Sequence, residues 1–131
     1  MNRNRISIIA LALLCLAATT VTGAEQHIKA NLDSASGSSV SGFVELTQLP
    51  HGGTNIHVVA NGLHSGTTYA SFYYESADCT APADLLGTFV GNAAGVGVVD
   101  GKIDDDLDEV GSVSVRLGPG YGTLLACARV H

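Results

Sequence analysis

Apolar and polar residues alternate with a period of two along most of the chain beyond residue 25. In the first such segment, Ile28, Ala30 and Leu32 are each separated by one polar residue. This alternation is typical of β-strands that bury one face and expose the other. We expect about eight strands, over residues 27–32, 40–47, 55–60, 68–75, 85–90, 92–99 (a turn followed by a strand), 112–117 and 123–130.

Turn-forming residues separate the expected strands. Ser34–Ser39 is rich in serine and glycine, Pro50–Gly53 combines proline with two glycines, and Gly118–Gly120 encloses a proline. Proline fixes φ and glycine permits positive φ, so these residues favour turns. No long helical pattern, linker or internal repeat interrupts the series. The sequence therefore predicts one all-β domain, a Greek-key β-sandwich or barrel of antiparallel strands, or else an immunoglobulin-like sandwich.

The first 24 residues follow a different pattern. Two arginines lie within residues 2–5, Ile6–Ala18 contains no charge, and the small residues Thr22-Gly23-Ala24 follow. This order is typical of a secretory signal peptide. The apolar run of about 13 residues is shorter than the ~20 needed to span a bilayer. We expect a signal peptide over 1–24, a mature domain over 25–131 without a transmembrane span, and export to the periplasm or the extracellular space.

Removal of the signal peptide changes the charge of the chain. Four basic residues then stand against twelve carboxylates, so the formal net charge of residues 25–131 is −8. A protein that binds nucleic acid needs basic residues that contact phosphates and release counterions. No basic patch is available here, so the sequence excludes nucleic acid as a partner.

Cysteine usage fits an exported domain. Cys15 lies inside the expected signal peptide, and the leucines that precede it do not suit a lipid-attachment signal. Cys79 and Cys127 remain, and an even pair of cysteines in an oxidising compartment indicates a disulfide. The bond would join residues 48 positions apart. In the chain-entropy model, a loop of that length stabilises the fold by roughly 4 kcal/mol.

The order of several short motifs matches a known family. The strand Ser41–Gln48 is followed by a second strand that ends in Gly62-Leu63, then by an aromatic strand leading to Cys79, and finally by Leu125-Ala126-Cys127. Over most of the mature chain this arrangement resembles the copper–zinc superoxide dismutase family. The resemblance implies a Greek-key β-barrel and a disulfide from the loop after the copper-site strand to the Leu-Ala-Cys motif. A resemblance to chordin-type extracellular β-domains rests on the same strand pattern, but the two cysteines favour the dismutase family.

The family's metal ligands are not present at the matching positions. Its His-x-His copper pair falls on Phe72 and Tyr74 when counted back from Cys79, and on Ser71 and Tyr73 when counted forward from Gly62-Leu63. The five residues between Cys79 and Leu85 contain no histidine for the zinc site, and the strand at 111–117 contains none for copper. Leu124 stands where the family has its substrate-guiding arginine, and the loop that guides superoxide is reduced to 118–122.

Other residues could bind a ligand in place of the missing metal centre. His51 and His64 are expected in turns and His57 on a strand, so they would form a weak copper or zinc site if the turns converge. Ordinary surface histidines are the alternative. Five carboxylates lie within six residues and could offer oxygen ligands to a hard cation, or could simply keep the domain soluble. They are Asp104, Asp105, Asp106, Asp108 and Glu109.

Two tyrosines of the aromatic strand are candidates for a binding face. Tyr69 and Tyr73 could present their rings to a partner, although packing is the alternative because aromatic residues favour strands. Tyr73 and Tyr74 are adjacent and must point to opposite faces of the sheet, so at most one of them can lie in the core. The sequence contains no Gly-x-Ser-x-Gly nucleophile motif and no phosphate-binding glycine loop in its usual context.

These observations favour a non-catalytic module over an enzyme. We expect an exported superoxide dismutase-like β-domain without the copper and zinc ligands, which binds a protein or cell-surface ligand or serves as a structural module, and which needs no cofactor. The alternative is a metal-binding protein or a divergent superoxide dismutase with relocated histidine ligands, holding copper or zinc weakly.

Overall fold

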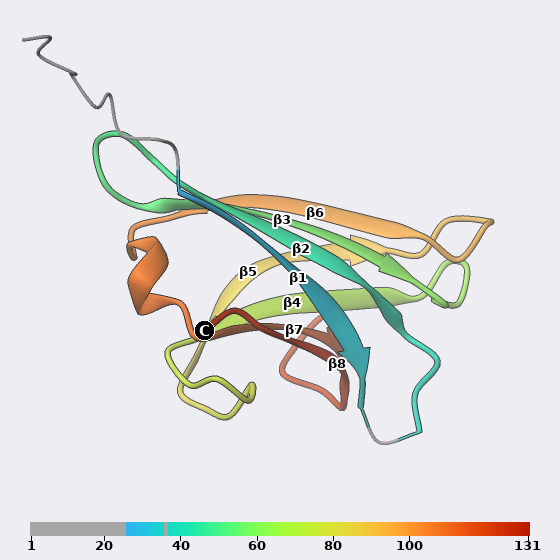
Figure 1. Ribbon diagram of the computed structural model, residues 1–131. Coiled ribbons are helices and arrows are strands. Elements are labelled where there is room, and N and C mark those ends of the chain that lie inside the picture. The colour runs from blue at the N-terminus through green and yellow to red at the C-terminus, as the bar shows by residue number, and fades with distance from the viewer. Residues whose placement is uncertain (1–25, 36) are drawn as a thin grey trace, which may run out of the picture.

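A computed structural model describes residues 26–35 and 37–131 (Figure 1). All eight expected strands are present, together with one short 3₁₀ turn, η1. The elements are β1 (His27–Ser34), β2 (Ser41–Gln48), β3 (Thr54–Asn61), β4 (Thr68–Tyr74), β5 (Ala83–Val90), β6 (Gly97–Ile103), η1 (Leu107–Glu109), β7 (Ser112–Leu117) and β8 (Leu124–Arg129). The prediction of an all-β domain of antiparallel strands is confirmed.

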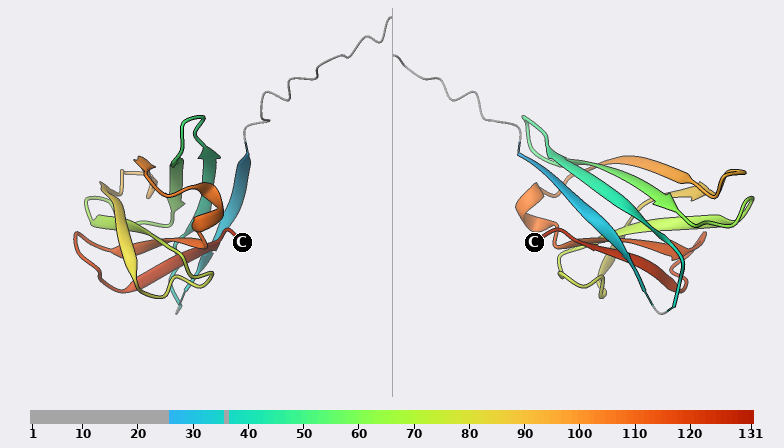
Figure 2. Two further views of the ribbon diagram at one scale, coloured as in Figure 1. Left: turned by 90° about the vertical axis from the view of Figure 1, so that its left-hand side faces the viewer. Right: turned by 45° about the vertical axis from the view of Figure 1, so that its right-hand side comes forward.

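The strands form one sheet that curls into a nearly closed barrel. Their order is β5-β4-β7-β8-β1-β2-β3-β6, and every neighbouring pair is antiparallel. Strand β1 joins the two halves, because it pairs along most of its length with β2 and through its last two residues with β8. The left view of Figure 2 shows the sheet curling round on itself. The two strands that end the sheet order, β5 and β6, therefore come close to each other.

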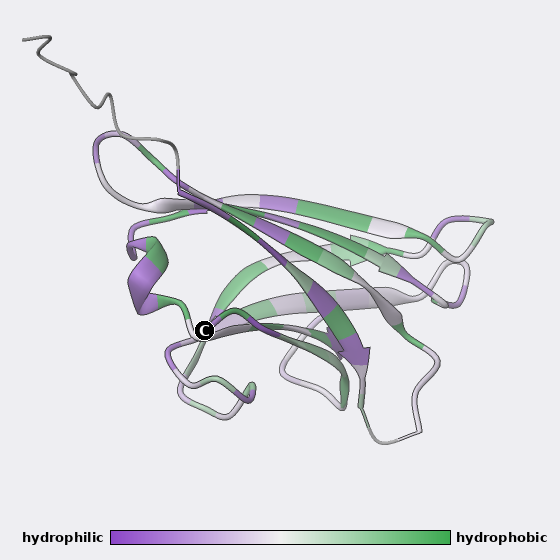
Figure 3. Ribbon diagram, viewed as in Figure 1, coloured by the Kyte–Doolittle hydropathy of each residue, from purple (hydrophilic) through white to green (hydrophobic). Residues whose placement is uncertain are grey.

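The predicted alternation places apolar side chains inside this barrel. On β3, for example, Ile56, Val58 and Ala60 are fully buried and the residues between them are half-buried. Figure 3 shows the resulting change of hydropathy from residue to residue along the strands. The buried residues of the main core are Leu32, Val40, Val44, Leu46, Ile56, Val58, Ala60, Leu63, Tyr69, Phe89, Ile103, Leu107, Val110, Val113, Val115, Ala126 and Ala128.

A second, smaller cluster lies on the outer face of β4. Ala70, Phe72 and Tyr74 pack there with Cys79 of the following loop. Tyr74 is only 1 % exposed although it points away from the barrel interior. As the alternation along β4 predicts, Tyr73 and Tyr74 point to opposite faces of the sheet. The loop over residues 75–82 covers the outer face, so Tyr74 is buried as well.

The expected disulfide holds that loop against the barrel. Cys79 and Cys127 are bonded, with their Cα atoms 6.1 Å apart. The hydroxyl of Ser112 accepts a hydrogen bond of 3.0 Å from the Cys79 amide and donates one of 2.6 Å to the Ser76 carbonyl. Ser114 shares a hydrogen bond of 2.7 Å with the Tyr74 hydroxyl. Ser112 and Ser114 alternate with the inward-pointing Val113 and Val115 and so lie on the outer face of β7, but they are buried because the loop covers them.

Strand boundaries depart from the prediction where pairing extends beyond the apolar pattern. Strand β6 continues to Ile103, beyond the expected end at residue 99, because it pairs with the whole of β3 from Ala60 to Thr54. Strand β5 begins at Ala83, two residues early, because Ala83 and Asp84 pair with Tyr74 and Tyr73. Ladder hydrogen bonds with a neighbour sustain these polar segments although their own pattern is weak.

Within the described residues, no helix is long and apolar enough to cross a membrane. The expected signal peptide over 1–24 lies outside the described residues.

Candidate functional site

The two ends of the barrel differ sharply in charge. At one end lie the loops over residues 35–40, 62–67, 91–96 and 118–123, which join β1 to β2, β3 to β4, β5 to β6 and β7 to β8. None of these loops contains aspartate, glutamate, lysine or arginine. We call this end, defined by these loops, the charge-free end. At the opposite end, the acidic end, the loops over 75–82 and 104–111 hold seven of the twelve carboxylates of the sequence.

A groove opens at the charge-free end. Its volume is about 360 Å³, near the lower limit for small-ligand sites. Apolar side chains of the barrel form its floor, and serine, glycine and histidine residues form its rim. The lining residues are Gly37, Ser38, Ser39, Val40, Gly62, His64, Tyr69, Leu117 and Leu125.

Backbone hydrogen bonds hold the loops of the charge-free end in place. The Leu63 amide donates to the Gly95 carbonyl at 3.0 Å, and the Gly66 amide donates to the Gly91 carbonyl at 2.9 Å. These bonds fasten the loop between β3 and β4 to the loop between β5 and β6. The Ala35 amide donates to Leu125 at 2.9 Å and ties a third loop to β8. The surface is therefore ordered before any partner arrives, which lowers the entropic cost of binding.

Glycine at position 62 allows this close packing of loops. Gly62 has φ of 75°, and a Cβ atom there would overlap the carbonyl oxygen of Ser39 in the neighbouring loop. The amide of His64 donates a hydrogen bond of 2.8 Å to the Tyr69 hydroxyl, which fixes the next residues of the same loop. A side chain at position 62 would push the two sides of the groove apart.

The predicted histidine site does not assemble. His51 lies in the turn before β3, His57 lies near the middle of β3, and His64 lies beyond its far end. A strand rises about 3.3 Å per residue, so β3 alone separates the two turns by more than 20 Å. His51 and His64 are thus at opposite ends of the barrel, and the three imidazoles cannot share one ion.

His57 belongs instead to a row of polar side chains on the outer face of the sheet. Its Nδ1 atom is 3.1 Å from a carboxylate oxygen of Asp100, and Lys29 lies 3.9 Å from Glu45. Register places Lys29 beside Glu45, Glu45 beside His57, and His57 beside Asp100. Cross-strand pairs of this kind stabilise a sheet, so the contact with Asp100 accounts for His57 without a ligand.

The positions that match the family's copper ligands do not fit a copper ion. Ser71 is fully buried and donates a hydrogen bond of 2.8 Å to the Ser114 carbonyl. Phe72 and Tyr74 pack in the outer cluster, and Tyr73 packs against the main core. None of these residues offers an imidazole, and a redox copper site requires several.

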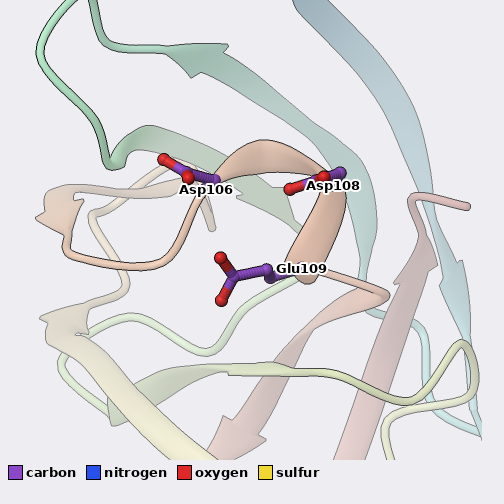
Figure 4. A group of neighbouring side chains, drawn as sticks. All are labelled: Asp106, Asp108 and Glu109. Atoms are coloured by element: carbon purple, nitrogen blue, oxygen red, sulfur yellow. The ribbon is translucent and has the colours of Figure 1, made fainter.

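Three carboxylates of the acidic loop do come together. Ligand atoms of Asp106, Asp108 and Glu109 lie within 4.8 Å of one another around η1 (Figure 4). Asp104 and Asp105 are not part of this group. Of the five residues predicted as a cation loop, the structure therefore gathers three.

Asp106 already has a structural role. One of its carboxylate oxygens accepts hydrogen bonds of 2.9 Å from the Gly53 amide and from Gln48 Nε2. These two bonds, first that from Gly53 and then that from Gln48, lower the pKa of the Asp106 carboxyl below its ordinary range. The Gln48 Oε1 atom accepts a further bond of 2.7 Å from the Leu107 amide. The side chain of Gln48 thus fastens the acidic loop to the turn between β2 and β3.

The two tyrosines predicted as a binding face are not available together. Tyr69 is only 2 % exposed, and its ring stacks on Phe89 at 5.9 Å inside the core. Tyr73 is half-buried near the acidic end. Its burial, assisted by the charges of Asp84 and Asp105, raises the pKa of its hydroxyl. Packing accounts for both residues, and Tyr69 reaches the groove only as part of its floor.

Arg116 connects β7 to both the disulfide loop and the charge-free end. Its guanidinium donates hydrogen bonds to the Tyr74 hydroxyl at 2.9 Å, to the Gly122 carbonyl at 3.0 Å and to the Cys79 carbonyl at 3.2 Å. It also lies 3.8 Å from the ring centre of Tyr121. With a further bond of 2.9 Å to the Tyr121 hydroxyl, these contacts hold the Arg116 guanidinium beside the loop over 118–123.

A scan against known protein families finds none that matches this chain, and a search of curated proteins finds no match either.

The charge-free end is the feature that sequence reasoning missed. The sequence does contain the pattern that indicates it: each of its loops lacks charged residues, while the acidic residues cluster elsewhere. The loops are far apart in sequence, however, and they meet at one end because successive strands run in opposite directions around the barrel. Each loop taken alone is a simple turn, so no single loop indicates the surface that the four form together.

Proposed function

We propose that this chain is an exported, non-catalytic binding module on a superoxide dismutase-like barrel, and that it contacts its partner through the charge-free end. The observation that carries the proposal is the set of four loops without charge at one end of an otherwise acidic domain, two of which, over 35–40 and 62–67, line a groove. Loops held on a rigid scaffold are common sites of binding. The central parts of protein interfaces are depleted in charged residues, as this surface is.

Several features support export and the scaffold. The signal-like pattern of residues 1–24 and the Cys79–Cys127 disulfide both suit an oxidising compartment outside the cytoplasm. The eight-stranded barrel and the disulfide from the loop after β4 to the Leu-Ala-Cys motif agree with the family resemblance. Fold alone does not carry an activity, and the residues at the family's ligand positions cannot perform its metal chemistry.

The partner that fits this end has an uncharged contact surface, on a protein or on cell-surface material. A charged group brought into the groove would lose water without gaining an opposite charge, which is costly. The high negative charge at the opposite end keeps the domain soluble and repels other copies of the same end. The two ends thus divide binding and solubility between them.

Binding of the purified domain to cells of its source tests the proposed surface. A fluorescently labelled domain is compared with the variants Ser39→Asp and His64→Asp, which place a charge at the rim of the groove. Asp108→Ser, at the acidic end, is the matched control. We expect the two rim variants to bind at least about tenfold more weakly, a loss of about 1.4 kcal/mol. Equal binding by all variants, with unchanged thermal stability, would contradict the proposal.

Metal analysis tests the non-catalytic part of the proposal. The domain is purified without chelators, offered copper and zinc, dialysed and measured by elemental analysis and by superoxide dismutase assay. We expect less than stoichiometric metal and no activity above that of free copper. Stoichiometric copper that is lost on His57→Ala substitution would instead support a relocated metal site.

A further inference from the structure

Among the residues that the structure describes, no ladder of hydrogen bonds closes the barrel. Strand β5 pairs only with β4 and strand β6 pairs only with β3, so β5 and β6 form the two ends of the sheet order. They are consecutive in the chain and are joined by the loop over 91–96, yet no ladder connects them within the described residues. We call the line between β5 and β6 the seam. Each of these strands has one edge on the seam without a neighbouring strand.

Side chains close the seam in place of a ladder. Leu86 of β5 lies over Gly101 of β6, where its Cδ1 atom is 2.5 Å from the position that a Cβ would take. Val99 of β6 lies over Gly87 of β5 in the same way, at 2.8 Å from Cγ2. Leu86 and Val99 also pack against the main core. The closure is reciprocal, because each strand supplies one large side chain that packs over a glycine of the opposite strand.

The outer surface of the seam is unusually apolar for an acidic domain. Leu85 and Val90 of β5 are both 54 % exposed, and Val98 of β6 is 51 % exposed. These are three of the five large hydrophobic residues that are exposed among the described residues. Exposed apolar groups beside an unpaired strand edge are a common place for another strand to add.

Charge along the seam is unevenly distributed. Val90 and Val98 lie toward the charge-free end, whereas Asp84 and Asp100 lie toward the acidic end together with Lys102. The carboxylates outnumber the single lysine there. A complementary strand would be uncharged and apolar at one end and would carry a basic residue at the other.

We propose that the seam accepts an extended peptide segment of a partner protein as an additional strand between β5 and β6. Main-chain groups of the segment would pair with the two free edges, which is the β-augmentation mode of peptide recognition. Leu86 and Val99 would move off Gly101 and Gly87, and the space above these glycines would receive side chains of the segment. A second copy of this chain is a poor occupant, because two domains with a large net negative charge repel each other.

The seam is separate from the groove of the proposed function, so the two proposals can fail independently. A locked variant provides the sharpest test. With Gly87→Cys and Val99→Cys together, the Cβ atoms would come close enough for a disulfide, which would join β5 to β6. Mass spectrometry establishes that the lock has formed. Val98→Asp is a second variant, chosen at an exposed position where folding is not at risk, and Asn31→Asp on the exposed face of β1 is its matched control.

The experiment selects phage-displayed random eight-residue peptides on the wild-type domain, with prior removal of peptides that bind the locked variant. We expect enriched peptides with alternating apolar residues and a terminal basic residue. Their affinity should fall by at least about tenfold for Val98→Asp and not for Asn31→Asp. Bound peptide should slow hydrogen exchange in β5 and β6.

Three results would overturn the proposal. The first is a selection in which no peptide is enriched on the wild type over the locked variant. The second is enriched peptides that bind Val98→Asp as well as the wild type. The third is protection from hydrogen exchange in the loops over 62–67 and 118–123 rather than in the seam, which would support the proposed function alone.

Discussion

The charge-free end and the acidic end of the barrel are built in different ways. At the charge-free end, backbone amides and carbonyls of separate loops bond to one another, and glycines allow the loops to approach closely. At the acidic end, backbone bonds also join Gly111 to Tyr74 and Val130, but side chains and a disulfide supply further links between the loops. Gln48 bonds to the turn before β3 and to the acidic loop, and a disulfide holds the loop over 75–82.

This difference has a consequence for function. Backbone bonds need no charged side chain, so the charge-free end can be rigid and still present only neutral groups to a partner. At the acidic end, side chains such as Gln48 hold the loops together, and several carboxylates stay in water. Exposed carboxylates favour solubility. Substitutions should therefore distinguish the two ends, because changes at the acidic end should lower the stability of the fold without weakening binding of the partner.

Removal of the disulfide should have the largest effect on stability. The Cys79→Ala/Cys127→Ala variant loses a bond that closes a span of 48 residues, worth roughly 4 kcal/mol in the chain-entropy model. Urea denaturation measures the change in the free energy of unfolding. Where the variant is still folded, binding through the charge-free end should be unchanged. A loss below about 1 kcal/mol would show that the loop is held mainly by its hydrogen bonds.

Gly62→Ala should come next and should act on the charge-free end. The substitution forces alanine into φ of 75° and against the Ser39 carbonyl, at an expected cost of about 2–3 kcal/mol. Gly37→Ala is the control, because Gly37 has the same φ but no atom within 4 Å of a Cβ. The difference between their free energies of unfolding isolates the contact between loops. Equal losses would mean that only backbone strain matters.

Gln48→Met should have a smaller effect, confined to the acidic end. Methionine keeps the length of the side chain but removes its bonds to the Gly53 carbonyl, the Asp106 carboxylate and the Leu107 amide. The expected loss is about 1–2 kcal/mol, since Gly53 and Leu107 are buried and their freed carbonyl and amide lose a hydrogen-bond partner. Hydrogen exchange should rise in residues 104–109 and not in the groove loops. A rise in both would show that the two ends are coupled.

Asp106→Asn should have the smallest effect, and one that depends on pH. The folded-state pKa of Asp106 is lowered, so its ionised form stabilises the fold at neutral pH, and this stabilisation disappears as the pH falls through the depressed pKa. The wild type should therefore melt at a higher temperature than Asp106→Asn at neutral pH, and the gap should close in acid. Asp108→Asn serves as the control. A gap that stays constant with pH would contradict the assigned role of the carboxylate.

Much of the fold could be predicted from the sequence because the core follows a simple rule. Ile56, Val58 and Ala60 alternate with more polar residues and point inward, as the period of two requires. The pairing of Cys79 with Cys127 followed from cysteine number and compartment. The buried serines Ser112 and Ser114 could not be predicted, because their own strand pattern assigns them to solvent. A loop 30 or more residues earlier in the chain covers them. The periodicity of a strand does not show whether a distant loop will bury its outer face.

The candidate site was harder to predict than the fold. His51, His57 and His64 looked able to converge as long as the turns were unplaced, but β3 runs between the first and the last of them. The acidic loop was visible in the sequence, yet the engagement of Asp106 by Gln48 depends on residues 58 positions apart. The charge-free end depends on four connections that reach the same end of the barrel, so it becomes visible only with the topology.

Photocrosslinking tests whether a partner binds the charge-free end. A photoreactive amino acid is placed singly at Ser39 and His64 on the rim of the groove, and at Asp78 and Glu109 at the acidic end. Each variant is exported from its source cells, irradiated and analysed for adducts by mass spectrometry. We predict one common partner adduct from Ser39 and His64 and none from Asp78 and Glu109. Adducts formed equally at both ends, or only at the acidic end, would contradict the account.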